Sequence, residues 1–286
     1  MIARRVEAAI PPAGRFIEIA GNRVHYIDRG DGPPLVLVHG LAGVMQNFTH
    51  SLVDRLTSRF RVIAIDRTGA GYSVRARDAG ASIAAQAATL GGFIEALGLD
   101  RPLVCGHSLG AAYALALAID RPKLARALAL IAPYTQPERR APAPFTALEI
   151  ESRWQRALIA HTVAVPLSMM HGARVVRQIF SPEAVPDDFA IAGGGLLGLR
   201  ASQFFHASSD MIAARDDMPA LVMRYGEVGV PVHVLFGIED AVLDYRRHGE
   251  TFRTQIPNAD LRLVHGGHML PVTQPDLVAA WLDSIV

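Results

Sequence analysis

The 286-residue chain lacks several features that would point to specialised classes of protein. Cys105 is its single cysteine, so no internal disulfide framework can form. Its 28 Lys and Arg residues nearly balance its 27 Asp and Glu residues, and they form no long basic run. The composition therefore gives no reason to expect nucleic acid or an anionic membrane as a partner.

Long hydrophobic segments are also missing. No window reaches about 18 uninterrupted apolar residues, so we expect no stable membrane insertion. The first dozen residues contain two arginines but no apolar stretch long enough for a signal peptide. Together with the unpaired cysteine, this favours a cytoplasmic location, although the sequence allows that the natural N-terminus is longer.

Half of the residues are hydrophobic, and short apolar runs alternate with helical patterns along most of the chain. The runs predict strands near 15–19, 24–28, 35–39, 62–66, 103–105, 125–132, 232–236 and 261–264. Helical patterns cover about 46–57, 82–97, 109–119, 245–256 and 275–285. This alternation predicts an α/β fold with a mostly parallel sheet and helices on both faces.

The alternation stops between residues 133 and 217. This segment begins with four prolines within 12 residues and then shows helical patterns without clear strands. A structureless loop of this length would be unusual. We therefore expect a helical cap (lid) at 133–217, inserted in a core made of 1–132 and 218–286, with a second independent domain as the alternative.

A possible nucleophile lies between the predicted strand at 103–105 and the helix at 109–119. Residues 106–110 read Gly-His-Ser-Leu-Gly, which fits the pattern G-x-S-x-G. In this context the pattern is typical of a nucleophile elbow, a turn so tight that only glycine fits beside the serine. We predict that Ser108 is the catalytic nucleophile.

A serine nucleophile needs a base and an acid to orient that base. His268 follows the last predicted strand and is the preferred base over the neighbouring His265. Asp240 follows the strand at 232–236 and is the preferred acid, with Glu239 and Asp244 as alternatives. The order Ser, Asp, His along the chain is that of hydrolases with a nucleophile elbow.

The oxyanion of an acyl-transfer intermediate needs two backbone N–H donors. Leu109, the residue after the nucleophile, should supply one of them. The loop after the strand at 35–39 should supply the other, and we predict Leu41. The sequence contains no metal-binding spacing such as H-E-x-x-H or paired C-x-x-C, and we expect no metal and no cofactor.

With these motifs, the chain resembles the α/β-hydrolase superfamily, in its esterase- and lipase-like branch, over nearly its whole length. Residues 66–73, Asp-Arg-Thr-Gly-Ala-Gly-Tyr-Ser, also resemble the D-x-x-G-x-G-x-S turn of that superfamily, which we interpret as structural. The resemblance implies an eight-stranded sheet, a cap between strands six and seven, and acyl-enzyme chemistry without a cofactor. Epoxide hydrolases and haloalkane dehalogenases resemble this scaffold but place aspartate at the elbow, so Ser108 argues against those two activities.

The expected activity is hydrolysis of small to medium hydrophobic esters by a monomer or homodimer. The alternatives are a C–C bond hydrolase, a lactonase, a perhydrolase, or a non-catalytic binder of a hydrophobic ligand. The substrate prediction depends on apolar residues of the insert, which have the competing explanation of forming the cap's own core. They are Phe145, Trp154, Leu158, Met169, Met170, Phe180, Leu196, Leu197, Phe204 and Phe205.

Overall fold

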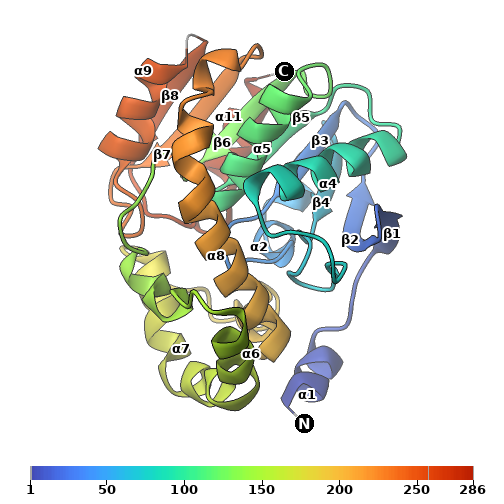
Figure 1. Ribbon diagram of the computed structural model, residues 1–286. Coiled ribbons are helices and arrows are strands. Elements are labelled where there is room, and N and C mark those ends of the chain that lie inside the picture. Colours follow the sequence, from blue (N-terminus) through green and yellow to red (C-terminus); the bar gives the residue numbers. More distant parts are fainter. Residues whose placement is uncertain (1, 257, 286) are drawn as a thin grey trace.

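The computed structural model describes residues 2–256 and 258–285 and is built around one eight-stranded sheet (Figure 1). The strands are β1 (Arg15–Ile19), β2 (Asn22–Arg29), β3 (Pro34–Val38), β4 (Arg61–Ile65), β5 (Leu103–His107), β6 (Ala127–Ile131), β7 (Val232–Gly237) and β8 (Ala259–Val264). The predicted α/β fold with a mostly parallel sheet is confirmed, because the six strands from β3 to β8 run parallel.

The strand order β1-β2-β4-β3-β5-β6-β7-β8 places the earliest parallel strand, β3, in the middle of the sheet. The chain goes from β3 to β4 on one side and then to β5 on the other. Ligand sites of open α/β sheets lie beyond the carboxyl ends of the strands at such a switch point. The loops after β3 and β5 are therefore the first place to look for a site.

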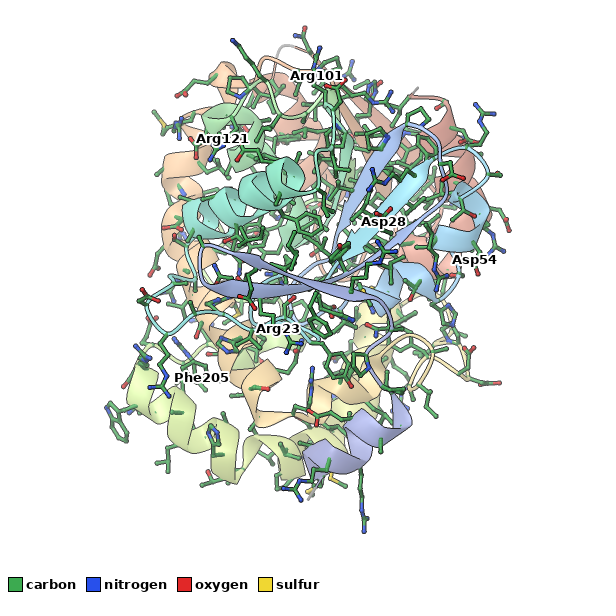
Figure 2. The ribbon with its side chains drawn as sticks, turned by 90° about the vertical axis from the view of Figure 1, so that its right-hand side faces the viewer. Arg23, Asp28, Asp54, Arg101, Arg121 and Phe205 are labelled. Atoms are coloured by element: carbon green, nitrogen blue, oxygen red, sulfur yellow. The ribbon has the colours of Figure 1, made fainter. Side chains whose placement is uncertain are left out.

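The antiparallel hairpin of β1 and β2 forms the outer edge of the sheet and pairs with β4. Arg23 of β2, labelled in Figure 2, lies over Phe16 of β1, with its guanidinium carbon 3.9 Å from the centre of the ring. The central strands have almost no exposed surface, which explains why their sequences are continuous apolar runs without alternation. Cys105 is fully buried within β5.

Helices flank the sheet, with α4, α5 and α8 in front of it in Figure 1 and α11 behind it. The α-helices are α1 (Ile2–Ala9), α2 (Gln46–Thr49), α3 (Val53–Leu56), α4 (Ile83–Ala96), α5 (Leu109–Asp120), α6 (Arg153–Thr162), α7 (Ala164–Phe180), α8 (Ala201–Val222), α9 (Phe252–Gln255), α10 (Leu270–Thr273) and α11 (Pro275–Asp283). Short 3-10 helices cover Ala143–Leu148, Gly195–Leu199 and Tyr225–Glu227, and one π-helical segment covers Arg246–Thr251.

Two helical predictions need correction, and helix α1 was not predicted. The single helix expected at 46–57 is two short helices, α2 and α3. The helix expected at 245–256 contains the π-helical segment before α9. Helix α1 had no counterpart in the predictions, because its apolar face is short; Val6 and Ile10 become buried only by packing near Leu197 of the insert.

The segment between β6 and β7 is helical, as expected for 133–217. Helices α6 and α7 lie together at one end of the molecule, and α8 runs from them along the sheet (Figure 1). The predicted boundary between 217 and 218 falls inside α8. The C-terminal part of α8, with Ala214, Met218 and Leu221, packs in the main core, so a separate cap stays a proposal.

None of the helices that the structure describes is long and apolar enough to cross a membrane.

Candidate active site

Ser108 lies on the sharp turn between β5 and α5. Its φ of 53° is in the left-handed region that side chains rarely adopt, and its ψ is −121°. A Cβ at Gly106 would lie 2.6 Å from the backbone nitrogen of Ala111, and one at Gly110 would overlap the carbonyl oxygen of Val38. The two glycines are therefore required for β5, α5 and the end of β3 to approach one another.

The predicted acid and base meet beyond the ends of β7 and β8. Asp240 Oδ2 accepts a hydrogen bond from His268 Nδ1 at 2.8 Å, and both side chains are buried. The other carboxylate oxygen of Asp240 accepts the backbone N–H groups of Val242 and Leu243 at 2.8 and 2.9 Å. These contacts fix the imidazole as the tautomer whose Nε2 is free to accept a proton.

The alternative residues occupy different positions. His265 pairs with Glu239 at 3.1 Å, and its side chain is 88% exposed. Glu239 also accepts the backbone N–H of Gly266, so it holds the loop that leads to His268. Asp244 accepts the backbone N–H of Arg246. These contacts give His265, Glu239 and Asp244 structural roles at the protein surface.

His107, which precedes Ser108, connects the two halves of the site. Its Nε2 donates to the carbonyl oxygen of His268 at 2.9 Å, and the two rings lie 4.9 Å apart. Burial lowers the pKa of His107 to about 3, so it acts as a neutral donor. The G-x-S-x-G motif does not predict this role, since nothing in it indicates which loop His107 contacts.

Ser108 Oγ and His268 Nε2, both within the described chain, form no hydrogen bond in this structure. In free enzymes this contact is often long or poorly aligned and tightens in the substrate complex. The structure thus brings Ser108, Asp240 and His268 to the same end of the sheet, with the hydrogen bond between Asp240 and His268 formed.

The predicted oxyanion donors lie on either side of Ser108. Leu109 is the first residue of α5, so its N–H has no acceptor within the helix. Leu41 follows Gly40, whose Cβ, if present, would lie 2.8 Å from the Ser108 Cβ. Among the described residues, neither the Leu41 nor the Leu109 N–H has a hydrogen-bond acceptor.

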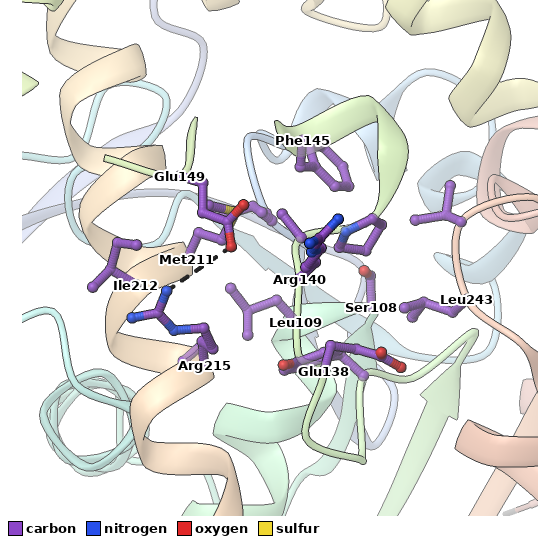
Figure 3. A pocket seen from close by; sticks show the side chains of 16 residues that line it. Ser108, Leu109, Glu138, Arg140, Phe145, Glu149, Met211, Ile212, Arg215 and Leu243 are labelled. Atoms are coloured by element: carbon purple, nitrogen blue, oxygen red, sulfur yellow. Dashed lines mark ion pairs between the residues drawn. The ribbon is translucent and has the colours of Figure 1, made fainter. Parts of the chain in front are cut away.

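A pocket opens over Ser108 (Figure 3). Leu41, Leu109, Val242 and Leu243 come from the core, while the insert supplies the remaining wall. The charged residues Glu138, Arg140, Glu149 and Arg215 also line it, and Arg215 and Glu149 lie 3.9 Å apart. The apolar residues from the insert are Ala141, Pro142, Phe145, Met211, Ile212 and Ala214.

This lining differs from the apolar residues singled out in the sequence. Of those ten, only Phe145 lines the pocket. Trp154, Leu158, Met169 and Met170 are exposed on α6 and α7. Leu196 and Leu197 pack with Val6 and Ile10, and Phe180 packs with Met269 and Val272. Met211 and Ile212 were missed, because the helical pattern alone does not indicate which face of α8 turns toward Ser108.

Within residues 2–256 and 258–285, no group of three or more His, Cys, Asp or Glu side chains is placed to hold a metal ion.

Comparisons with known proteins agree with the fold. A family model described as the alpha/beta hydrolase fold matches residues 33–163. Haloalkane dehalogenase 2 of Mycobacterium tuberculosis is 36% identical over 125 residues, which are 42% of this chain and 42% of that protein. The 2-hydroxymuconate semialdehyde hydrolase of Pseudomonas putida is 38% identical over 122 residues, which are 42% of this chain and 43% of that protein. Each of these two matches spans less than half of the relative.

A solved structure covers far more of the chain. The enol-lactonase of Burkholderia xenovorans LB400 superposes with a TM-score of 0.76 over 94% of this chain and 98% of its own. The sequence identity is 20%, so this likeness shows the fold alone.

The close approach at the elbow gives a first prediction. We expect Gly110→Ala to lower the free energy of unfolding by roughly 2–3 kcal/mol, because its Cβ would overlap backbone that cannot move aside. Gly172→Ala on α7 is the control, since open space surrounds that position and alanine favours the helix by about 0.5–1 kcal/mol. Urea unfolding measures both; equal effects of the two substitutions would refute the packing argument.

The buried His107 gives a second prediction. Between its ordinary pKa of about 6.5 and the folded value of about 3, the unfolded chain binds more protons than the folded chain. Stability is therefore lost as the pH falls through this window. The substitution His107→Gln keeps a side-chain N–H donor. When the pH is lowered from 7 to 5, we expect the free energy of unfolding of this variant to fall by about 2 kcal/mol less than that of the wild type.

Urea unfolding at the two pH values measures this difference. His161→Gln, a substitution of an exposed histidine on α6, is the control and should keep the wild-type pH dependence. A wild-type pH dependence in His107→Gln would show that His107 does not contribute to it.

Proposed function

We propose that this chain, which has the α/β-hydrolase fold and matches the family model of that description over residues 33–163, is a serine hydrolase that cleaves carboxylic esters. The observation that carries the proposal is the strained elbow at Ser108, which lies at the same end of the sheet as the Asp240–His268 hydrogen bond. A serine in this conformation presents its hydroxyl to the pocket, and His268, which is paired with Asp240, is the candidate base.

The proposed reaction has two halves. His268 Nε2 takes the proton of Ser108 Oγ as the oxygen attacks the ester carbonyl, and Asp240 stabilises the imidazolium. The N–H groups of Leu41 and Leu109 hold the oxyanion, and the alcohol leaves with the proton from His268. Water then loses a proton to His268, attacks the acyl-enzyme and releases the acid.

The pocket supports a hydrophobic acyl or aryl group of small to medium size. The walls beside Ser108 are apolar, and Phe145, Met211 and Ile212 come from 133–217, which we propose acts as a cap over the site. Charged residues such as Arg140 and Arg215 line the same pocket. We infer that the acyl group packs on the apolar walls and that any polar part of the substrate lies toward these charges.

The same residues would serve a C–C bond hydrolase, a lactonase or a perhydrolase. The similarity to a 2-hydroxymuconate semialdehyde hydrolase and to an enol-lactonase keeps the first two as candidates. A haloalkane dehalogenase is disfavoured despite the 36% identity, because Ser108 stands where that class carries aspartate. A non-catalytic binder would not need the buried Asp240–His268 pair.

The third prediction tests the nucleophile. We expect the purified protein to hydrolyse p-nitrophenyl esters between acetate and laurate, and Ser108→Ala to lower kcat by about 10³-fold or more, since the acyl-enzyme cannot form. The exposed Ser58→Ala is the matched control and should retain full activity.

Fluorophosphonate labelling separates the alternatives. A wild type that is labelled at Ser108 but does not turn over these esters would favour the lactone or C–C substrates. A folded wild type that neither reacts with the esters nor becomes labelled would refute the proposed serine hydrolase and favour the binder.

The fourth prediction tests the acyl pocket. Met211→Ala should shift the preferred acyl chain to longer esters, because Met211 lines the pocket over Ser108. Met218→Ala, two helical turns along α8, removes a fully buried side chain from the main core and should lower stability by roughly 2–5 kcal/mol without changing the acyl preference. An unchanged chain-length profile in Met211→Ala would place the acyl group elsewhere.

A further inference from the structure

The carbonyl oxygen of Gly40, in the loop after β3, accepts three hydrogen bonds. The donors are Arg67 Nη2 at 2.8 Å, His39 Nδ1 at 2.9 Å and the backbone N–H of Gly43 at 3.2 Å. The tautomer of His39 follows from its second contact, because its Nε2 accepts the backbone N–H of Arg67 at 3.0 Å. Burial lowers the pKa of His39 to about 3, so the ring is neutral and its proton is on Nδ1.

These three bonds fix the direction of the next N–H group. The Gly40 carbonyl and the Leu41 N–H belong to one planar trans peptide, so they point in opposite directions. Donors on the carbonyl side therefore orient the N–H on the other side, and they polarise the amide so that it donates more strongly. Gly40 packs against Ser108, so this N–H lies beside the nucleophile.

Arg67 is itself held by the insert. Its Nε donates to the His39 carbonyl oxygen at 2.9 Å, and its Nη1 donates to Asp210 Oδ2 at 2.9 Å. Asp210 lies on α8 and is 2% exposed, and its other carboxylate oxygen pairs with Arg75. Tyr113 of α5 completes the surroundings, with the guanidinium carbon 5.0 Å from the centre of its ring.

A buried ion pair is weak evidence of a contribution to stability, because desolvation offsets most of its attraction. The geometry of Arg67 suggests a more specific role. Besides its ion pair with Asp210, its guanidinium bonds two successive carbonyl groups, those of His39 and Gly40, at the end of β3. The contact thus fixes a backbone conformation next to the reacting atoms.

We propose that Arg67 and Asp210 are positioning residues that set the direction of the Leu41 N–H and link helix α8 to the oxyanion hole. Neither side chain touches the substrate. This inference rests on the proposed serine hydrolase function and extends it to residues outside the triad, one of which comes from the inserted segment.

The test compares Arg67→Met and Asp210→Asn with the wild type. Asp210→Asn keeps the shape of the side chain but loses its charge. We expect kcat for a p-nitrophenyl ester to fall about 30-fold in Arg67→Met and about 5-fold in Asp210→Asn, less than the 10²–10³ typical for a lost oxyanion donor. KM should change less than about twofold, because the ground-state carbonyl depends little on this N–H.

A trifluoromethyl ketone, which forms a tetrahedral adduct with the serine, gives the second readout. The affinity of each variant for this ketone should fall, relative to the wild type, in the same proportion as kcat, since the adduct carries the oxyanion. End-point titration with a fluorophosphonate corrects for any unfolded fraction. If Arg67→Met does not fold, the near-isosteric Asp210→Asn still tests the proposal.

Arg156→Met is the matched control. Arg156 is also a buried arginine that bonds α8, through Ser208 and Ser209, but its other contacts are backbone carbonyls at Ile150 and Glu151, away from the Gly40 loop. The substitution Arg156→Met should lower Tm, while kcat per titrated site and the affinity for the trifluoromethyl ketone stay at the wild-type value.

Equal kinetic effects of Arg67→Met and Arg156→Met, or a change of Tm alone in Arg67→Met, would overturn the positioning role while leaving the proposed hydrolase intact. A wild type inert to both the ester and the fluorophosphonate would overturn both proposals.

Discussion

The close packing of β5 against α5 is the constraint on which the rest of the site depends. Because Gly106 and Gly110 carry no side chains, the helix begins directly at the end of the strand and Ser108 is forced into a left-handed conformation. The same packing leaves the first N–H of α5 without an acceptor in the helix and brings Gly40 against Ser108. One local approach of backbone therefore positions the hydroxyl and both candidate oxyanion donors.

The buried polar groups around this turn differ in charge for a physical reason. His39 and His107 are neutral, because burial disfavours their charged forms and each has hydrogen bonds suited to the neutral ring. Arg67 keeps its charge and needs a buried partner, which Asp210 supplies. His107 thus holds the His268 loop, while His39 and Arg67 together hold the Gly40 loop.

The inserted segment is coupled to the core more closely than a simple lid would be. Helix α8 carries Met211 on the pocket wall, Asp210 in the ion pair with Arg67, and Met218 in the main core. A helix that contributes to all three cannot move far as a rigid body without disturbing the Arg67 contacts. Helices α6 and α7 expose apolar residues such as Trp154 and Met170. They make fewer contacts of this kind with the core.

Sequence patterns predicted the strands well, because buried parallel strands are continuous apolar runs and the glycines of the elbow are a steric necessity at Ser108. The order of Ser108, Asp240 and His268 along the chain also matched that of hydrolases with a nucleophile elbow, so these three positions could be proposed from the sequence. The pocket wall could not be predicted in this way. Whether Trp154 or Met211 faces Ser108 depends on how α6 and α8 pack on the sheet, and the helical period is the same in either case.

The sequence alone therefore determined the fold class and the candidate nucleophile, since both depend on local patterns of size and hydrophobicity. The tertiary structure decided which polar groups meet. His107 bonds the His268 loop 161 residues away, and Asp210 reaches Arg67 across 143 residues. Such contacts have no local signature, because a buried charge or ring is tolerated only where the folded chain brings its partner to it.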